Sequence, residues 1–407
     1  MPRRRTTRKP LLALLAAMLL APTALGDNDP RQPAAPGGWN QPGQAPGNTP
    51  PQAQPQDAAP DWVVPGVRIT LYGETGTTLK ENDPENPRIP VGGSGYQQFD
   101  VVAVTPEGVL MEVRYYQIPI GQTHPQLTDV QLKLFDAASG GQLWVPESER
   151  TNVPVTTAPD ANPRIELGPY ELEGDTYDAI HFLKTERNGE VTVRRVYDQR
   201  TGLLLYQSET LDDAEGKAIV WSRFDGYRVA QLPWQGSTLT DRVRALDRLV
   251  YESVVIKHAQ PPLPEQRVGS DITFEIGQTT EHLMQVAVTA RRHVPRGAPP
   301  TTDPDPTPVP QMISTHQRLG LYIAPEVLSQ LESGQRLDED PAIGYRIVVT
   351  DVYQVEGVTL VEITEQGPGN SYTANTTYDA SVGLAVAGRK TIPALDITIE
   401  STLIRVE

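Results

Sequence analysis

Cysteine is absent from the 407-residue chain. This absence excludes disulfide bonds, thiolate metal sites, a cysteine nucleophile and a lipid-modified N-terminal cysteine. Histidine is scarce, and its six positions show no ligand spacing: His124, His181, His258, His282, His293 and His316. His282 and His293 could meet across a pair of strands, but a zinc site needs three or four ligands. We therefore expect no metal site and no cofactor.

The sequence also lacks the common catalytic motifs. It contains no Gly-x-Ser-x-Gly, no His-Glu-x-x-His, no phosphate-binding glycine loop and no dinucleotide fingerprint. A two-carboxylate hydrolase needs only one pair of acids facing a cleft. Four acids cluster in the stretch YELEGDTYDA: Glu171, Glu173, Asp175 and Asp178. Because they alternate along an expected strand and turn, we interpret them as a solvated edge and expect no catalytic residues.

Long hydrophobic runs are lacking outside the N-terminal segment. In that segment MPRRRTTRK precedes the apolar run LLALLAAMLL, and Ala24, Leu25 and Gly26 fit the small-x-small cleavage rule. The apolar run is shorter than the roughly 20 residues that span a bilayer. We expect residues 1–26 to be a signal peptide cut before Asp27, with a retained signal anchor as the alternative. The protein would then be exported to the periplasm, the cell envelope or the medium of a bacterium.

Positive charge is also in short supply. The formal net charge is -16, and it falls to -21 without the first 26 residues, which hold five basic residues and no acid. A negative field repels phosphate backbones and anionic lipid surfaces. We therefore expect no nucleic-acid partner and no electrostatic docking to membranes.

Proline, by contrast, is abundant, with 39 residues. Residues 27–61 are rich in Pro, Gln, Gly and Ala and nearly lack branched aliphatic residues. Such a segment buries too little apolar surface to offset the entropy of ordering, so we expect a disordered linker. Aromatic-lined grooves bind Pro-rich segments, and Trp39 could anchor one, but a spacer is the preferred interpretation. A second Pro-rich stretch, 295–310, is expected to be a solvated loop.

The remaining chain has the texture of β-strands. Short runs rich in Val, Ile, Thr and Tyr alternate with turn residues, and the first four runs cover 67–74, 98–104, 109–119 and 130–136. Two stretches look helical. Apolar residues fall on one face over 237–256, where Thr240 can cap, and PEVLSQLESG has Pro325 at its start and Gly334 at its end.

One turn is written twice. VYDQRTGLLLYQSE (196–209) and TYDASVGLAVAGRK (377–390) share Tyr-Asp, three residues and Gly-Leu. Asp198 and Asp379 can accept a backbone N–H two residues on, while Gly202 and Gly383 can adopt positive φ and close a bulged hairpin. We interpret the turn as architecture.

Other landmarks recur in the same order. LMEVRYYQIP (110–119) matches LMQVAVTARRHVP (283–295), LWVPE (143–147) matches LYIAPE (321–326), and IVWSRFDGYRV (219–229) matches ITIESTLIRVE (397–407). We infer a mostly β protein of two tandem, duplicated, antiparallel curved-sheet domains of the half-barrel or meander type. The expected boundaries are 62–236 for the first domain, 237–260 for a connecting helix and 261–407 for the second domain.

The repeated turn resembles a hairpin in periplasmic lipoprotein carriers of the LolA and LolB type. The matching residues are Tyr197, Asp198, Thr201, Gly202, Leu203 and Leu204, while the second copy has Val382 in place of the threonine. The resemblance covers little more than one hairpin per half. It implies an open half-barrel whose concave face holds acyl chains or a partner segment.

Three classes of function stay open. The preferred one is a non-catalytic, exported envelope protein that presents its sheets as a binding or scaffold surface. The second is a carrier or chaperone for an apolar ligand such as a lipid or lipoprotein, and the third is a carboxylate-dependent hydrolase. Because Val, Ile and Leu dominate the strands, we expect an aliphatic binding face whose ligand is a protein segment or an apolar chain.

Overall fold

The computed structural model of the chain describes residues 58–78, 89–105, 108–119, 121–156, 158, 161–185, 191–213, 216–259, 264–293 and 306–407. The expected signal peptide and most of both Pro-rich stretches lie outside these residues. No helix in the described ranges is both long and apolar enough to cross a membrane.

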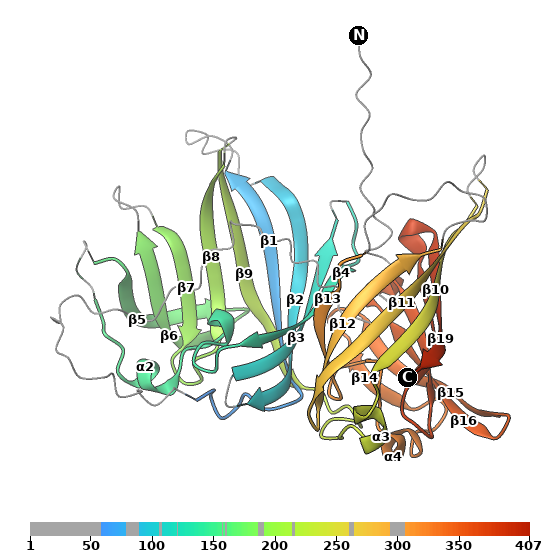
Figure 1. The fold of residues 1–407 in the computed structure, drawn as a ribbon. Helices are drawn as coiled ribbons and strands as arrows, with labels where there is room; N and C mark the ends of the chain where they lie inside the picture. Colours follow the sequence, from blue (N-terminus) through green and yellow to red (C-terminus); the bar gives the residue numbers. More distant parts are fainter. Residues whose placement is uncertain are drawn as a thin grey trace, which may run out of the picture.

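Two antiparallel sheets make up the structure and confirm the mostly β, two-domain prediction (Figure 1). The first, drawn in blue through green, has nine strands in the order β4-β3-β2-β1-β9-β8-β7-β6-β5. The second, drawn in yellow through red, has ten strands in the order β13-β12-β11-β10-β19-β18-β17-β16-β15-β14. In both sheets the first and last strands of the domain pair at the centre. We call the two units the nine-stranded domain and the ten-stranded domain.

The elements of the nine-stranded domain are β1 (Val67–Thr78), β2 (Ile89–Thr105), β3 (Gly108–Ile118), β4 (Gln126–Phe135), α2 (Glu147–Thr151), β5 (Arg164–Leu172), β6 (Asp175–Thr185), β7 (Val191–Asp198), β8 (Leu204–Asp213) and β9 (Gly216–Val229). Those of the ten-stranded domain are α3 (Asp241–Arg244), β10 (Arg248–Lys257), β11 (Gln266–Thr279), β12 (Leu283–Arg292), β13 (Val309–Ser314), α4 (Pro325–Leu328), β14 (Arg336–Asp340), β15 (Tyr345–Val355), β16 (Val358–Gln366), β17 (Thr373–Asp379), β18 (Ala385–Ile392) and β19 (Ile397–Val406). All four strands expected at the start of the first domain are present.

The expected connecting helix over 237–256 is wrong. Only α3 is helical, with Thr240 as its cap, and the rest of the stretch forms β10. The run RLVYESVVIK is rich in β-branched and aromatic residues, and its apolar positions satisfy helical and strand periods alike. These residues form a strand because they pair with β11 on one side and with β19 on the other. The second domain therefore begins before 261, because β10 is its central strand.

Two smaller expectations also need correction. The helix expected from Pro325 to Gly334 is only the four-residue α4, although Gly334 does adopt a φ of 84°. The second Pro-rich stretch ends earlier than expected, because Val309 and Pro310 already belong to β13.

The repeated turns occupy corresponding places in the two sheets. Gly202 has a φ of 79° and Gly383 a φ of 83°, and each donates its N–H to the carbonyl of the aspartate four residues earlier. The Asp198 carboxylate accepts the N–H of Arg200, and the Asp379 carboxylate accepts that of Ser381. The predicted turn chemistry is confirmed at both sites.

A second correspondence fixes what each turn contacts. Trp144 forms an isolated bridge with Leu203, and Tyr322 forms one with Leu384, so both aromatic landmarks dock on the residue after the turn glycine. Each turn therefore holds an aromatic residue of its own domain in the same way.

The core of the nine-stranded domain covers one face of its sheet. Val67, Ile69 and Leu71 alternate into it, while Arg68 and Thr70 point to the opposite face, as the pleat requires. The segment after β4 closes the core from outside the sheet with two buried residues, Leu143 and Trp144. The opposite face of the same sheet is built from different chemistry, and it positions the candidate site.

Candidate functional site

The face of the nine-stranded sheet that turns away from the core is polar and aromatic. Strand register identifies its members, because residues directly opposite on neighbouring strands share a face. Over β1, β2 and β3 the face carries a charged zone: Arg68, Gln98, Asp100, Glu112 and Arg114. From β2 across β1 and β9 to β5 it carries a second zone: Tyr72, Tyr96, Tyr170, His181, Arg194, Tyr206, Trp221 and Arg223. The ten-stranded domain covers the first zone. We call this zone, together with the residues of the ten-stranded domain that contact it, the interdomain charge cluster.

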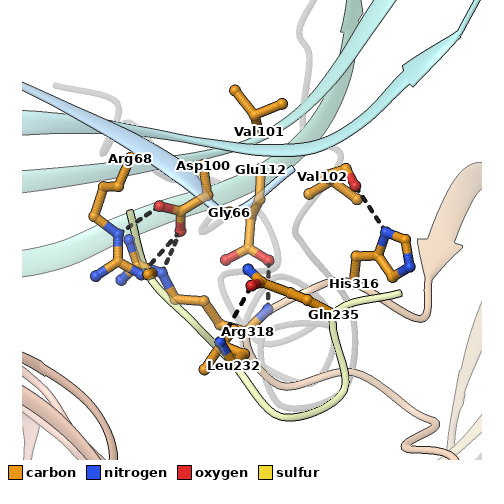
Figure 2. Close-up of a pocket in the computed structure, with 11 residues that line it drawn as sticks. Gly66, Arg68, Asp100, Val101, Val102, Glu112, Leu232, Gln235, His316 and Arg318 are labelled. Carbon is orange, nitrogen blue, oxygen red and sulfur yellow. Dashed lines mark hydrogen bonds and ion pairs between the residues drawn. The ribbon is translucent and has the colours of Figure 1, made fainter. Parts of the chain in front are cut away.

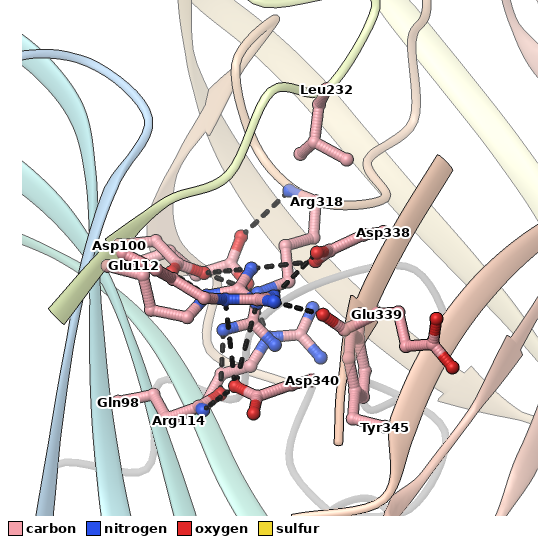
Figure 3. Close-up of polar contacts among 12 residues, drawn as sticks. Gln98, Asp100, Glu112, Arg114, Leu232, Arg318, Asp338, Glu339, Asp340 and Tyr345 are labelled. Atoms are coloured by element: carbon pink, nitrogen blue, oxygen red, sulfur yellow. Dashed lines mark hydrogen bonds and ion pairs between the residues drawn. The ribbon is translucent and has the colours of Figure 1, made fainter. Parts of the chain in front are cut away.

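Arginine and aspartate alternate through one half of the interdomain charge cluster (Figure 3). The Arg68 guanidinium donates to Asp100 at 2.5 Å and, across the domain boundary, to Asp338 at 2.9 Å. Arg318 of the ten-stranded domain donates to the second oxygen of Asp100 and, at 2.8 Å, to Gln98. Asp100 thus lies between one guanidinium from each domain, and its two ion pairs join them.

The other half of the cluster is centred on Arg114. Its guanidinium donates to Glu112 and to Glu365, each at 2.5 Å. Glu365 belongs to the ten-stranded domain and also accepts the hydroxyls of Tyr345 at 2.8 Å and Tyr372 at 3.0 Å. Because these groups are buried, each charge depends on its partners for the stabilisation that water would otherwise supply.

The electrostatics keep Asp100 and Glu365 ionised. Burial raises the pKa of the Asp100 carboxyl, but the guanidinium groups of Arg318 and Arg68 outweigh burial and hold this pKa well below its ordinary value. Burial likewise opposes ionisation of Glu365, and Arg114 with the tyrosine hydroxyl lowers its pKa to about 2. Burial lowers the pKa of Lys390, whose ammonium lies 4.7 Å from the Tyr372 ring, to about 8. A carboxylate so firmly ionised is a poor general acid near neutral pH.

A small pocket opens beside the cluster between Gly66, Asp100, Glu112 and His316 (Figure 2). His316 donates its Nδ1–H to the Val102 carbonyl at 2.8 Å, and its Nε2 accepts the N–H of Gly236 at 3.0 Å. The pocket leaves about 10 Å³ for the centre of a water-sized molecule. It therefore has room for about one water and not for an organic ligand.

The second zone lies on the side toward which the sheet bends. Tyr170 on β5 and Tyr206 on β8 have ring centroids 6.2 Å apart, although three strand steps separate β5 from β8. In a flat sheet the two strands would lie about 14 Å apart. Glu173, at the β5–β6 turn, reaches Arg223 on β9 at 2.8 Å. We call the residues of this zone the aromatic trough.

Aromatic rings follow one another along the trough. Tyr96 contacts Tyr72 at 5.2 Å between centroids, Tyr72 contacts Trp221 at 5.9 Å, and Trp221 stacks on Tyr206 at 6.4 Å. Tyr170 continues the row to His181 at 6.2 Å. All these side chains are half-buried, so each ring retains surface open to solvent.

Two guanidinium groups lie between the rings. Arg223 lies 5.7 Å from the centre of the Tyr72 ring and pairs with Glu173. Arg194 lies 5.9 Å from the centre of the Tyr170 ring and 5.6 Å from that of Tyr206. Within the part of the chain that the structure describes, Arg194 has no ion pair, and its Nε is buried without a hydrogen-bond partner. The trough thus offers flat apolar surface and one cation that has no carboxylate partner among the described residues.

The acids singled out in the sequence lie where the solvated-edge interpretation places them. Glu171, Asp175 and Asp178 are exposed on the β5–β6 hairpin, and β5 is the edge strand of the sheet. Glu173 is in the turn itself, with a φ of 52°.

His282 and His293, which could have met across a strand pair, lie apart. His282 and His293 flank opposite ends of β12, where His282 contacts the ring of His316 and His293 pairs with Asp271. No cluster of three or more metal-ligating side chains occurs among the described residues.

The aromatic trough is the feature that sequence reasoning missed. Its aromatic residues make up a small share of the composition and come from six strands. Alternation does place Tyr72 beside Thr70 and Arg68 on one face of β1, which is the only local signal.

Comparisons with known proteins leave the family open. No family model matches the chain, and neither does any curated protein. A solved structure described as MucB in complex with MucA(peri) is 9% identical, with a TM-score of 0.17 over 82% of this chain and 89% of that one. A protein of unknown function from the DUF3598 family of Nostoc punctiforme PCC 73102 is 8% identical, with a TM-score of 0.13 over 84% of this chain and 97% of that one. Identities and TM-scores this low support neither a family nor a function. The function is therefore inferred from the site.

Proposed function

We propose that the protein is an exported, non-catalytic binding module that holds an extended protein segment in the aromatic trough. The observation that carries this proposal is Arg194, a half-buried cation between the rings of Tyr170 and Tyr206 with no carboxylate among the described residues. A guanidinium in that position is available to an acidic group of a ligand whose neighbouring groups pack on the rings.

An extended segment suits the trough better than a compact ligand. The rings form a row from β2 to β5 at centroid spacings of 5.2 to 6.4 Å, which is an elongated surface. Aromatic-lined grooves recognise polyproline II segments because such segments are already extended and lose little entropy on binding. The hydroxyls of the trough tyrosines, apart from that of Tyr72, which donates to Glu74, can donate hydrogen bonds to the carbonyls that such a segment leaves unpaired.

The interdomain charge cluster contributes rigidity in this proposal. It ties the ten-stranded domain to β1, β2 and β3, directly beside the trough, through ion pairs such as Arg68 with Asp338. Because the strands beside the trough are held in place, the protein loses less conformational entropy when a ligand binds.

The two other classes of function have less support. A carrier of apolar chains needs an unfilled apolar cavity, whereas Trp144 fills the core side of the sheet so closely that a Cβ on Gly140 would lie 2.2 Å from its ring. A carboxylate hydrolase needs one acid free to donate a proton, whereas Asp100, Glu112 and Glu365 each accept from a guanidinium.

An array of extended, proline-containing 12-residue peptides tests the proposal by fluorescence polarisation. Peptides that bind the wild-type protein should lose about tenfold or more in affinity, about 1.4 kcal/mol, with Arg194→Gln or Tyr206→Ala. Arg195→Gln is the matched control, because Arg195 lies on the opposite face beside Phe182 and should leave affinity unchanged. Equal losses in Arg194→Gln and Arg195→Gln, binding of an acidic polysaccharide in place of peptides, or cleavage of bound peptide would each contradict the proposal.

A further inference from the structure

A bulge in β9 brings an acidic side chain to the aromatic trough. Thr70 of β1 pairs with Gly226 and Leu71 pairs with Phe224, so Asp225 is the extra residue on β9. Phe224 packs against the core on the opposite face of the sheet. Bulges re-aim the side chains that they contain, and the half-buried Asp225 carboxylate is directed toward the trough.

The electrostatic neighbours of Asp225 establish this direction. Its carboxyl interacts with the charges of Glu173, Arg223 and Asp340, and Asp225 is itself the first of the charges that act on the hydroxyl of Tyr96. Burial, followed by the negative charge of Glu173, raises the pKa of Asp225, because both disfavour an ionised carboxyl. A cation brought by a ligand would relieve this repulsion.

The neighbouring acids already have cation partners, whereas Asp225 does not. Glu173 pairs with Arg223 at 2.8 Å, and Asp340 lies 3.8 Å from Arg228. Within the described part of the chain, no cation lies at ion-pair distance from Asp225, and the Arg223 guanidinium beside it is the partner of Glu173. This end of the trough therefore has a surplus of negative charge.

The trough thus presents a cation on β7 and an anion on β9, each without an ion-pair partner among the described residues. We propose that the segment bound in the trough carries an acidic and a basic side chain, the acid placed on Arg194 and the base, a lysine or an arginine, placed on Asp225. This inference rests on the proposed function of the trough and specifies the charge pattern of its ligand.

Strand register sets the spacing of the two charges. Arg194 is opposite Ser208, which is opposite Trp221, so Asp225 lies two strands away and four residues further along β9. The two backbone positions are then about 14 to 16 Å apart. Tyr206 lies on the Asp225 side of Ser208, and the Arg194 guanidinium leans to within 5.6 Å of its ring. An extended segment advances about 3.1 to 3.4 Å per residue, so its acid and base should be about three to five positions apart.

Peptides with one acid and one base test the pattern by fluorescence polarisation with the full chain. The probes are 12-residue, proline-containing peptides with a fixed glutamate and a lysine placed one to eight positions away on either side. We expect the tightest binding at separations of about three to five, and an approximately fivefold loss when glutamine replaces that lysine. With Asp225→Asn the same replacement should change nothing, whereas replacing the peptide glutamate should cost as much as it does with wild type.

Two further variants sharpen the comparison. Glu209→Gln is the matched control, because Glu209 is a half-buried acid on the neighbouring strand β8 that lies on the opposite face of the sheet. It should leave the effect of the peptide lysine as in wild type. Asp225→Lys should reverse the preference, so that a peptide with two glutamates binds more tightly than one with glutamate and lysine. All variants should keep the wild-type unfolding midpoint, and the dependence on spacing is measured with wild type alone.

Each outcome decides between alternatives. If replacing the peptide lysine costs the same with wild type and Asp225→Asn, the pairing with Asp225 is wrong, and equal affinity at all separations contradicts the spacing. If either occurs while the peptide glutamate still contributes with wild type and not with Arg194→Gln, this inference fails and the proposed function stands. If no peptide binds in an Arg194-dependent way, both fail together.

Discussion

Tyr170 and Tyr206 are in ring contact, with centroids 6.2 Å apart, although β6 and β7 lie between their strands. This contact exists because the sheet bends, and the same bend brings Glu173 to Arg223 at 2.8 Å. The trough is thus a property of the backbone of the neighbouring strands from β2 to β5, and its rings are held in place by sheet geometry. Side-chain changes there are expected to affect binding more than folding.

Breaking the centre of the interdomain charge cluster should be costly. Asp100→Ala leaves Arg68 and Arg318 buried without their shared carboxylate, so we expect the free energy of unfolding to fall by about 3 to 5 kcal/mol in urea titrations. Glu339→Ala is the control, because it removes an exposed pair with Arg336 and should cost less than about 1 kcal/mol. Similar costs for the two variants would mean that the cluster does not hold the domains together.

Acid should weaken the same interface. The pKa of Glu365 is about 2 in the folded protein against an ordinary 4.5, so the folded state binds fewer protons than the unfolded state between these values. Stability from this group is therefore fully present above about pH 4.5 and is lost as the pH falls toward 2. Denaturant titrations at several pH values should show this loss, and it should be smaller in Glu365→Gln. An identical acid profile in the variant would refute the assignment.

Lys390 should also make the free energy of unfolding rise with pH, but in the alkaline range. Burial lowers its pKa to about 8 from an ordinary 10.5, so in this interval the unfolded state binds more protons. Its contribution to stability should therefore rise with pH from about 8, until tyrosines of the unfolded chain begin to ionise near pH 10. The difference in unfolding free energy between wild type and Lys390→Met should grow in favour of wild type across this window. A constant difference would show that Lys390 does not titrate there.

The turn glycine of the first domain should be intolerant of any side chain. A Cβ at Gly202 would lie 2.3 Å from the Val145 carbonyl oxygen, in addition to requiring a φ of 79°. Gly334 has a φ of 84° with nothing within 4 Å of an added Cβ, so Gly334→Ala isolates the backbone cost of about 1 kcal/mol. Gly202→Ala should cost more than this control, and Gly202→Val more again. Thermal unfolding of the three variants would show whether the close approach adds to the backbone strain.

Sequence by itself determined the local features of the protein. Alternation of apolar residues indicated the strands of the first domain, and the pattern from Asp198 to Gly202 indicated a turn that the structure contains twice. The same reasoning placed Glu171 on a solvated edge, where it lies. These inferences succeed because pleat and turn chemistry act over a few neighbouring residues and leave a readable pattern.

Tertiary structure decided what depends on distant partners. The residues of β10 suit a helix or a strand, and only their pairing with β11 and β19 selects the strand. Arg68 meets Asp338, 270 positions away, and the rings of the aromatic trough meet because the sheet bends toward them. Neither leaves a sequence pattern, because the energy of a buried ion pair or a ring contact depends on positions in space that the folding of the whole chain sets.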